Sequence, residues 1–242
     1  MGNQWFRFKK FTIQQDKCAM KVGTDGVILG AWTDIADAQT ALDIGTGTGL
    51  LALMLAQRSS SIHIDAIEIE KEASFQASQN VSKSKYSSQI TVLNRDFNIF
   101  WKGCNAKYDL IISNPPFFYD SMKPESQGRK HARHTETLSI DQILSSSKEI
   151  LSPQGRLSII FPAELVEGAI ENAEDCCLFP IRILYIKPTP EKTPKRVCLE
   201  FSFNKKDTLL ETIVIEDGGR HNYSDEYREL TKDFYLDNSL DA

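Results

Sequence analysis

The stretch Ala41-Leu42-Asp43-Ile44-Gly45-Thr46-Gly47-Thr48-Gly49 decides the fold of this chain. A run of seven residues that are all apolar follows it. The first part predicts a buried strand, the glycines predict a tight turn, and the apolar run predicts a helix. Glycines let the backbone of such a turn approach a ligand closely, and the first N–H groups of the helix then point at that ligand. The stretch therefore predicts a strand–turn–helix unit with a ligand at its turn.

The residue types in this turn indicate which ligand it binds. A dinucleotide-binding turn reads Gly-x-Gly-x-x-Gly, but Leu50 stands where its last glycine would be. Here Asp43 precedes the glycines, and a carboxylate is a poor neighbour for an anionic pyrophosphate. The cationic amino group of S-adenosylmethionine suits it better. We therefore expect the methyl donor rather than NAD, bound by Asp43, Gly45, Thr46, Gly47 and Gly49.

A second acidic residue follows the next predicted strand, residues 62–67. Glu68 lies at the distance downstream at which a carboxylate binds both ribose hydroxyls of an adenosine, with Ile69 directly after it. Glu70 is the competing candidate, but it is better placed to begin the next helix, where Ala73, Ala77 and Val81 share one face. We expect Glu68 and Ile69 at the donor site.

A third candidate pair follows the strand predicted at residues 90–93. Asp96 would accept a hydrogen bond from the adenine amino group of the donor, and Phe97 would lie beside the ring. A lone Asp after a strand more often forms a turn. Its position in the series of strand ends favours the functional interpretation.

The fourth predicted strand, residues 108–113, ends in a rigid corner. Asn114 is followed by two prolines, which cannot donate to a sheet and hold the backbone extended. In an open α/β sheet, ligands bind at this edge. An amide, a fixed carbonyl and the aromatic rings of Phe117 and Phe118 suit a flat, hydrogen-bonding base. Taken alone, Asn114 would be a strand cap and the rings a core pair, but the acidic residues that precede them in order favour a site.

Strands that alternate with helices predict an α/β fold, a doubly wound and mostly parallel Rossmann-like sheet. Two later strands, residues 181–186 and 197–203, have no helix between them and predict antiparallel strands at one edge. The alternation in residues 5–11 predicts an edge strand or arm. We find no repeat or dividing linker, so we expect a single domain over residues 1–242, with residues 1–35 as an extension that packs on the core.

Composition excludes several classes of protein. Of 242 residues, 41% are hydrophobic and 25% charged, and no apolar run approaches the roughly 20 residues that span a membrane. Five cysteines without Cys-x-x-Cys spacing predict free thiols in a reducing cytoplasm. Four histidines in no ligand pattern predict no metal. The net charge of −5 argues against a protein that coats nucleic acid, but it leaves room for a locally basic face.

Two basic segments are candidate contacts for a phosphate backbone. Residues 121–136, directly after the corner, form either a solvated loop or an RNA contact. Residues 187–196 contain three prolines and four positive charges against one negative, and they predict a stiff, extended basic arm. The candidate RNA-binding residues are Arg129, Lys130, Arg133, His134, Lys192, Lys195 and Arg196.

The order of these motifs resembles the class I S-adenosylmethionine-dependent methyltransferase fold. The sequence Asn-Pro-Pro-Phe at residues 114–117 is similar to the motif of enzymes that methylate amino or amide nitrogens. Residues 8–11, 18–26, 133–134, 194–197 and 230–235 resemble the bacterial tRNA1(Val) adenine N6-methyltransferase family.

That resemblance implies methylation of adenine 37 in the anticodon loop of a valine tRNA, with S-adenosylmethionine as cofactor. It implies catalytic roles for Asn114, Pro115, Pro116 and Phe117, and contacts to the donor from Lys21, Thr24, Asp25 and Asn114. We expect a cytoplasmic monomer that binds the anticodon stem-loop.

Residue chemistry alone reaches only methyl transfer to an amino nitrogen. The alternatives are a guanine N2 in ribosomal RNA, a glutamine amide in a protein, or a factor that binds the donor and RNA without turnover. The N-terminal signature argues against the first two. Asn114 and Phe117 argue against the third, because a non-catalytic protein has little need of either.

Overall fold

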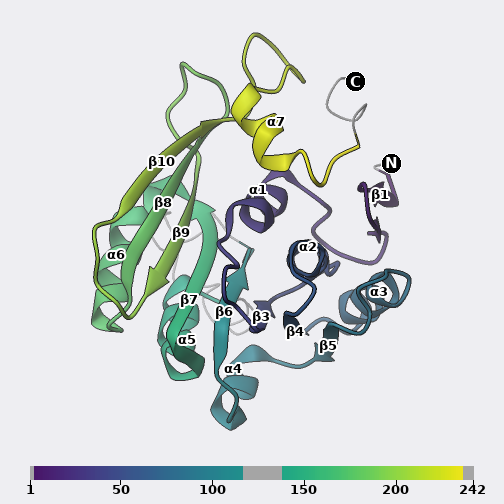
Figure 1. Cartoon of the computed structure of the whole chain (residues 1–242), viewed down its shortest axis with the longest axis vertical. Coiled ribbons are helices and arrows are strands. Elements are labelled where there is room, and N and C mark those ends of the chain that lie inside the picture. The colour runs from purple at the N-terminus through teal and green to yellow at the C-terminus, as the bar shows by residue number, and fades with distance from the viewer. Residues whose placement is uncertain (1–2, 117–137, 237–242) are drawn as a thin grey trace, which may run out of the picture.

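A computed structural model describes residues 3–116 and 138–236 of the chain. Its centre is an eight-stranded sheet with the order β10-β8-β9-β7-β6-β3-β4-β5 (Figure 1). The strands are β3 (Thr40–Ile44), β4 (His63–Glu68), β5 (Ile90–Asn94), β6 (Tyr108–Ser113), β7 (Leu151–Pro162), β8 (Phe179–Lys187), β9 (Arg196–Ser202) and β10 (Leu209–Val214).

The strand order creates a switch point at β3. From β3 the chain moves outward through β4 to β5, then returns to place β6 and β7 on the other side of β3, all of them parallel. Ligands of doubly wound sheets bind at such a reversal, outside the carboxyl ends of the strands. Antiparallel pairing occurs where it was predicted, but the reversed strand is β9, between β7 and β8, and β10 returns to run parallel to β8.

Helices cover both faces of the sheet because successive residues of its strands point to opposite sides. Ala41 and Ile160 pack into one hydrophobic core with the first helices of the chain, while their neighbours Leu42 and Ile159 pack into a second core. The first core includes residues of α1 (Thr24–Trp32), α2 (Leu50–Arg58), α3 (Lys71–Ser82) and α7 (Asp225–Thr231), and the second includes residues of α4 (Phe97–Phe100), α5 (Ile140–Ile150) and α6 (Val166–Asp175).

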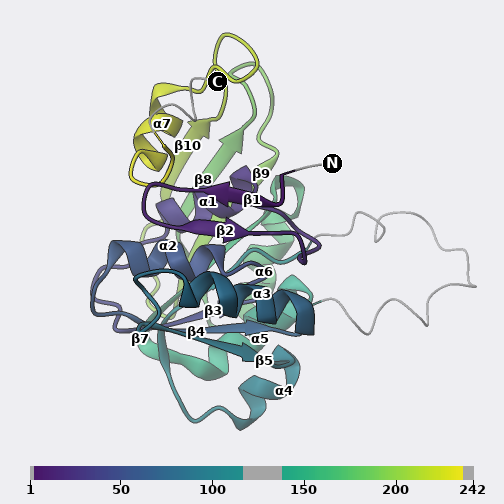
Figure 2. The same cartoon turned by 90° about the vertical axis from the view of Figure 1, so that its right-hand side faces the viewer.

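The N-terminal residues form a hairpin of their own rather than an edge of the main sheet. Strand β1 (Trp5–Arg7) pairs with β2 (Thr12–Gln14), and Figure 2 shows this hairpin lying across the helices of one face. The C-terminal segment holds it, because Lys9 N donates to Phe234 O at 2.8 Å and the Phe8 and Tyr235 rings stack with centroids 5.8 Å apart. Of the two alternatives, an edge strand of the main sheet is therefore wrong and an arm agrees with the structure, since apolar packing on the helices replaces pairing with the main sheet.

Strand β7 begins at Leu151, directly after α5, and its pairing with β6 is irregular between the pairs Tyr108–Leu151 and Leu110–Arg156. Residues 187–196 are a closed hairpin loop rather than an extended arm. Lys195 N donates to Ile186 O and Lys192 N donates to Thr189 O, so backbone hydrogen bonds fold the loop despite its prolines.

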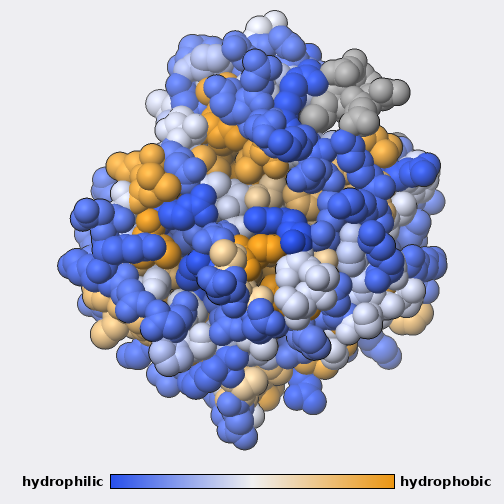
Figure 3. All heavy atoms as spheres, in the orientation of Figure 1, coloured by the Kyte–Doolittle hydropathy of each residue, from blue (hydrophilic) through white to orange (hydrophobic). Residues whose placement is uncertain are grey.

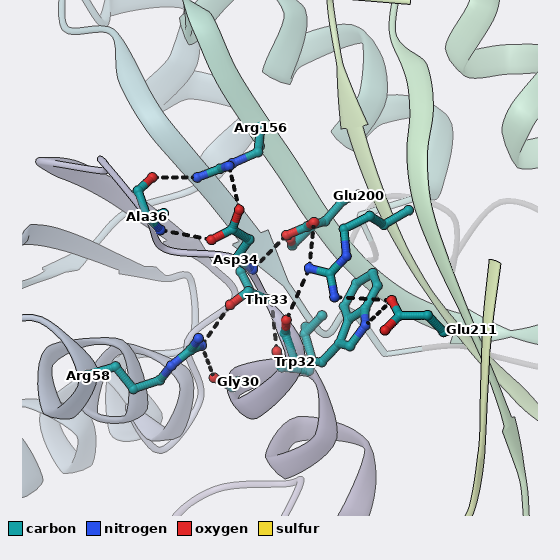
Figure 4. A network of polar contacts seen from close by, with 12 residues as sticks. Gly30, Trp32, Thr33, Asp34, Ala36, Arg58, Arg156, Glu200 and Glu211 are labelled. Carbon is teal, nitrogen blue, oxygen red and sulfur yellow. Dashed lines mark hydrogen bonds and ion pairs between the residues drawn. The ribbon is translucent and has the colours of Figure 1, made fainter. Parts of the chain in front are cut away.

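A buried carboxylate joins α1 to the antiparallel part of the sheet (Figure 4). Glu200 on β9 is fully buried, and its Oε1 accepts from Asp34 N at 2.8 Å and from Ser158 Oγ at 3.0 Å. Its Oε2 accepts from Arg182, which also pairs with Glu211 at 3.1 Å. Because each hydrogen-bond acceptor of this buried charge has a donor, the charge is tolerated and fixes the end of α1.

The face drawn in Figure 3 is mostly hydrophilic, with apolar groups in several separate patches. Within residues 3–116 and 138–236, no helix is long and apolar enough to cross a bilayer. The same residues contain no group of three or more His, Cys, Asp or Glu side chains that could hold a metal ion. All five cysteines are free, as predicted.

Candidate active site

The register of the central strands places the predicted residues at one edge of the sheet. Ile44, the last residue of β3, lies opposite Ile67 on one side and Ser113 on the other. The glycine-rich turn that follows Ile44 therefore lies between Glu68 and Asn114. Asp96 follows β5 at the same edge, since Glu68 pairs with Asn94.

The glycine-rich turn has the conformation that only glycine adopts without strain. Gly45, Gly47 and Gly49 all have positive φ, of 70°, 55° and 83°. The N–H groups of Gly45 and Thr46 both donate to Ile67 O at 2.9 Å, which fixes the turn against β4. A Cβ atom at Gly45 or Gly47 would meet no atom within 4 Å, so at these positions the backbone borders open space. This is the cradle that close approach of a ligand requires.

Asp43 lies under this turn and is fully buried. Its Oδ2 accepts from Thr46 Oγ1 at 2.5 Å and from Ala52 N at 3.2 Å, so the carboxylate ties the turn to the start of α2. Its Oδ1 is buried and has no hydrogen-bond partner in the described part of the chain. Burial raises the pKa of Asp43 to about 7. A buried oxygen without a donor, on a carboxyl that resists ionisation, fits the approach of a cationic amino group.

Glu68 also binds the glycine-rich turn. Its Oε2 accepts from Gly47 N at 2.9 Å and its Oε1 accepts from Glu70 N at 2.9 Å, while the side chain is 8% exposed. Glu70 is the N-cap residue of α3, as the sequence predicted. The next residue, Ile69, is 51% exposed, an unusual state for an apolar side chain at a strand end. Carboxylate and apolar surface together suit the ribose and adenine of S-adenosylmethionine.

Asp96 and Phe97, which the sequence predicted to contact the adenine, also have structural roles as a helix N-cap and a core side chain. Asp96 Oδ1 accepts from Asn98 N at 2.8 Å, so this carboxylate is the N-cap of α4. Asp96 also lines a cavity of about 400 Å³ with Ile99 and Cys104, among others. Phe97 is buried in the second hydrophobic core, so its ring is not available to stack on a ligand in this conformation.

Asn114 directly follows β6, and its side chain is partly exposed. Within residues 3–116 and 138–236, its amide makes no hydrogen bond, and a Cβ atom at Gly26 would lie 3.7 Å from its Nδ2. The N-terminal end of α1 thus borders the corner. Ser113 Oγ donates to Ile44 O at 2.9 Å, which joins the corner to the glycine-rich turn. Pro115 is buried and Pro116 is exposed.

The segment predicted to contact RNA is described only in part. Phe117, Arg129, Lys130, Arg133 and His134 lie outside the described residues. Lys192 and Lys195 are exposed on the loop between β8 and β9.

Arg196, the last residue predicted to contact RNA, forms an ion pair with Asp25 of α1. The distance from Arg196 Nε to Asp25 Oδ2 is 2.8 Å. Arg196 is also opposite Pro162, at the carboxyl end of β7, so the pair anchors α1 at the same edge of the sheet. Thr24 begins α1, whereas Lys21 is exposed and donates through Nζ to Asn3 O at 3.3 Å. The structure thus groups Thr24 and Asp25, but not the Lys21 amine, around the corner.

Sequence reasoning missed two buried amides on α3, Gln76 and Asn80. Asn80 Nδ2 donates to Thr48 O of the glycine-rich turn at 2.9 Å. The residues share one side of a predicted helix next to its apolar face, and a polar side chain at such a position is the signal that would have found them.

Fold and site together define a class I S-adenosylmethionine-dependent methyltransferase. The model of the family described as "Methyltransferase small domain" matches residues 27–170, which include every strand from β3 to β7. A solved structure of a predicted O-methyltransferase from Agrobacterium tumefaciens is similar with a TM-score of 0.65, at 16% identity over 87% of this chain and 96% of that one. An S-adenosylmethionine-dependent O-methyltransferase from Thermotoga maritima has a TM-score of 0.54, at 17% identity over 78% and 68% of the two chains.

Sequence relatives give the narrower family. A protein of Parabacteroides distasonis is 46% identical over 98% of this chain and 99% of its own length, and one of Trichodesmium erythraeum is 47% identical over the same shares. Both are named tRNA1(Val) (adenine(37)-N6)-methyltransferase. The chain belongs to this family.

Proposed function

We propose that this protein transfers a methyl group from S-adenosylmethionine to N6 of adenine 37 in tRNA1(Val). The names of its relatives support the substrate. The observation that carries the chemistry is the amide of Asn114, which makes no hydrogen bond within the described residues at the end of β6, beside the turn that Asp43 and Glu68 hold. The finer parts of the proposal are that the protein is a cytoplasmic monomer and that it recognises the anticodon stem-loop.

The target amine is a weak nucleophile because its lone pair is delocalised into the adenine ring. In the proposed complex the Asn114 side-chain oxygen and the Pro115 carbonyl accept its two N–H bonds. The nitrogen then becomes more tetrahedral, and its lone pair can point at the methyl group. Two prolines make this corner rigid, and such positioning can contribute roughly 7–11 kcal/mol in favourable cases.

The charge that develops on the nitrogen is stabilised by the same two acceptors, which are in place before the reaction begins. S-adenosylmethionine supplies a methyl group activated by a neighbouring sulfonium. No strong base is needed before attack, because the amine loses its proton afterwards. Phe117 would stack on the extruded base, at an expected ~1–3 kcal/mol. Extrusion is easier from a single-stranded loop than from a duplex.

Other residues have proposed roles in binding the donor and the RNA. Asp43 would pair with the amino group of the donor through Oδ1, and Glu68 would bind the ribose while it holds Gly47. Thr24 and Asp25 would approach from α1. Lys192 and Lys195, exposed on the β8–β9 loop, are proposed contacts to the RNA backbone, together with the basic residues of segment 121–136.

A product analysis tests the proposal. The protein is incubated with labelled S-adenosylmethionine and with unmodified total tRNA, ribosomal RNA and protein, and the methylated group is identified by mass spectrometry. Label in N6-methyladenosine of a valine tRNA supports the proposal. Label on guanine or on protein rejects it.

An Asn114→Ala variant tests the role of the corner. We expect loss of transfer with nearly unchanged binding of the donor, because the proposed contact to the amine is lost while Asp43, Glu68 and the glycine-rich turn remain to bind the donor. Asn172→Ala is the matched control, since Asn172 is an exposed asparagine on α6 that bonds only Asp141 in the described structure. If Asn114→Ala transfers methyl groups as fast as the control, the proposed contact to the amine is wrong.

A further inference from the structure

The segment that runs from the last residue of β2 toward α1, residues 14–22, is named the strap here. Backbone contacts alone do not hold it, since three buried amide side chains bond its backbone. Gln15 belongs to the strap and closes it, because its Oε1 accepts from Val22 N at 2.9 Å. The other two amides, Gln76 and Asn80, come from α3 and lie one helical turn apart.

Asn80 joins the strap to the glycine-rich turn. Its Oδ1 accepts from Gln14 N at 2.9 Å, and its Nδ2 donates both to Gln14 O and to Thr48 O at 2.9 Å. The side chain is 1% exposed, and both amide hydrogens are used. Because a buried amide that loses these bonds is costly, Asn80 stabilises one arrangement of the strap and the glycine-rich turn over others.

Gln76 bonds the middle of the strap in the same way. Its Oε1 accepts from Lys17 N at 3.1 Å and its Nε2 donates to Asp16 Oδ1 at 2.6 Å. Gln76 is buried, whereas Asp16 and Lys17 are exposed. The strap is therefore attached to α3 through polar contacts from the helix side, with its own charges facing solvent.

This attachment places the strap beside the glycine-rich turn, because Asn80 Nδ2 donates to both Gln14 O and Thr48 O, and Glu68 Oε2 accepts from Gly47 N of the same turn. Burial and the carboxylates of Glu68 and Asp16 raise the pKa of the Cys18 thiol to about 11, in keeping with this position. From Val22 the chain continues directly into α1, where Gly26 borders Asn114. One short segment thus runs from the ribose side of the proposed donor site to the methyl-transfer corner.

We propose that Gln76 and Asn80 are positioning residues for the methyl donor, which hold the strap and the glycine-rich turn in one arrangement so that the strap forms the ribose-side wall of the donor site. Neither side chain contacts the donor. Gln76 and Asn80 influence donor binding through their hydrogen bonds to Thr48 O and to the backbone of Gln14 and Lys17. This inference rests on the proposed location of the donor between Asp43 and Glu68.

The test measures binding of S-adenosylhomocysteine by calorimetry, together with KM for S-adenosylmethionine and kcat. Asn80→Ala leaves Thr48 O and the Gln14 backbone without their buried partners, and we expect a rise in KM and Kd of about tenfold or more with a smaller change in kcat. Gln79→Ala on the same helix is the control, because the Gln79 side chain makes no hydrogen bond within the described residues. We expect it to bind like the wild type.

A second variant keeps the test valid if Asn80→Ala unfolds the protein. Asp16→Ala removes the exposed partner of Gln76 and leaves the core intact. We expect weaker donor binding, by a few-fold, and faster amide hydrogen exchange in residues 15–22. A Gln76→Ala change made in the Asp16→Ala protein should weaken donor binding less than Gln76→Ala does alone, because both substitutions remove the same Gln76–Asp16 hydrogen bond.

The outcomes distinguish an error in the proposed role of the strap from an error in the proposed location of the donor. If Glu68→Ala abolishes binding but Asn80→Ala and Asp16→Ala bind S-adenosylhomocysteine like Gln79→Ala, the donor site is right and the positioning role is wrong. If Glu68→Ala binds normally, the proposed donor location is wrong and the inference falls with it. If the variants lower kcat and leave KM unchanged, the strap acts on the transfer step and not on the donor, which also overturns the proposal.

Discussion

Replacement of Asp43 by asparagine should make the free protein more stable and a poorer binder of its cofactor. The Asp43 carboxyl is fully buried, and burial raises its pKa from 3.8 to about 7. A difference of about 3 pKa units corresponds to about 4 kcal/mol of unfavourable free energy for the ionised form in the folded state. An asparagine side chain cannot ionise, so the variant avoids that cost.

The sign of the pH dependence follows from proton binding. Between pH 3.8 and about 7 the folded protein keeps a proton on Asp43 that the unfolded chain releases, so stability from this group is greatest below that range and falls as the pH rises through it. Each pH unit inside the range costs about 1.4 kcal/mol, so about 3 kcal/mol is lost between about pH 5 and pH 8.

Some of the gain is offset in the variant. The introduced amide can still accept from Thr46 Oγ1 and Ala52 N through its oxygen, but its NH₂ group would take the place of Asp43 Oδ1, which has no partner in the described residues. A buried NH₂ group without an acceptor costs about 1–3 kcal/mol. We therefore expect Asp43→Asn to be about 1–3 kcal/mol more stable than the wild type at pH 8, which raises Tm by about 2–4 °C per kcal/mol.

The assay is urea unfolding of both proteins at pH 5, 6, 7 and 8, with the wild-type free energy subtracted from that of the variant so that other titrating groups cancel. The difference should grow by about 3 kcal/mol across the series. Calorimetry at pH 8 should show donor binding weakened by about 10- to 100-fold, because a charged hydrogen bond is lost. A difference that stays constant with pH would refute the reasoning about burial, and unchanged donor binding would refute the pairing with the amino group.

Three further predictions concern other parts of the molecule. Glu200→Ala should destabilise the fold by about 3–5 kcal/mol in urea unfolding, because Arg182 and Ser158 lose a buried partner, and Glu200→Gln should cost less. Gly155→Ala should lower Tm, since its Cβ would lie 2.7 Å from Tyr108 O and 2.9 Å from Leu151 Cδ2, and an unchanged Tm would show that β7 can shift. Lys195→Ala should weaken tRNA binding and reduce its salt dependence by about one charge in filter binding across a salt series, and an unaltered slope would remove this loop from the RNA surface.

The strands and the glycine-rich turn of the doubly wound sheet could be predicted because the relevant signals are local. Buried strands read as apolar runs, and the glycines after Ile44 read as a turn because only glycine adopts that backbone without strain. The capping box of Ser139 and Gln142 is equally local, since both of its bonds join residues three apart in sequence. These features depend on neighbours along the chain.

The parts that could not be predicted depend on partners far away in the sequence. Asp96 had two possible roles, and only the geometry shows that its carboxylate caps α4. Arg196 read as a free cation of a basic segment, yet its guanidinium pairs with Asp25, 171 residues earlier. The sequence analysis missed Gln76 and Asn80, because their partners in residues 14–17 and at Thr48 lie far from them along the chain.

The packing of the N-terminal hairpin against the C-terminal segment has a consequence for the order of folding during synthesis. Phe6 and Phe8 pack on Tyr235, and Lys9 N bonds Phe234 O, so the hairpin finds these partners only after residue 235 has left the ribosome. The central strands can pair much earlier. Because the hairpin leads directly into the strap, the nascent chain would complete its sheet before it completes the binding site for its cofactor.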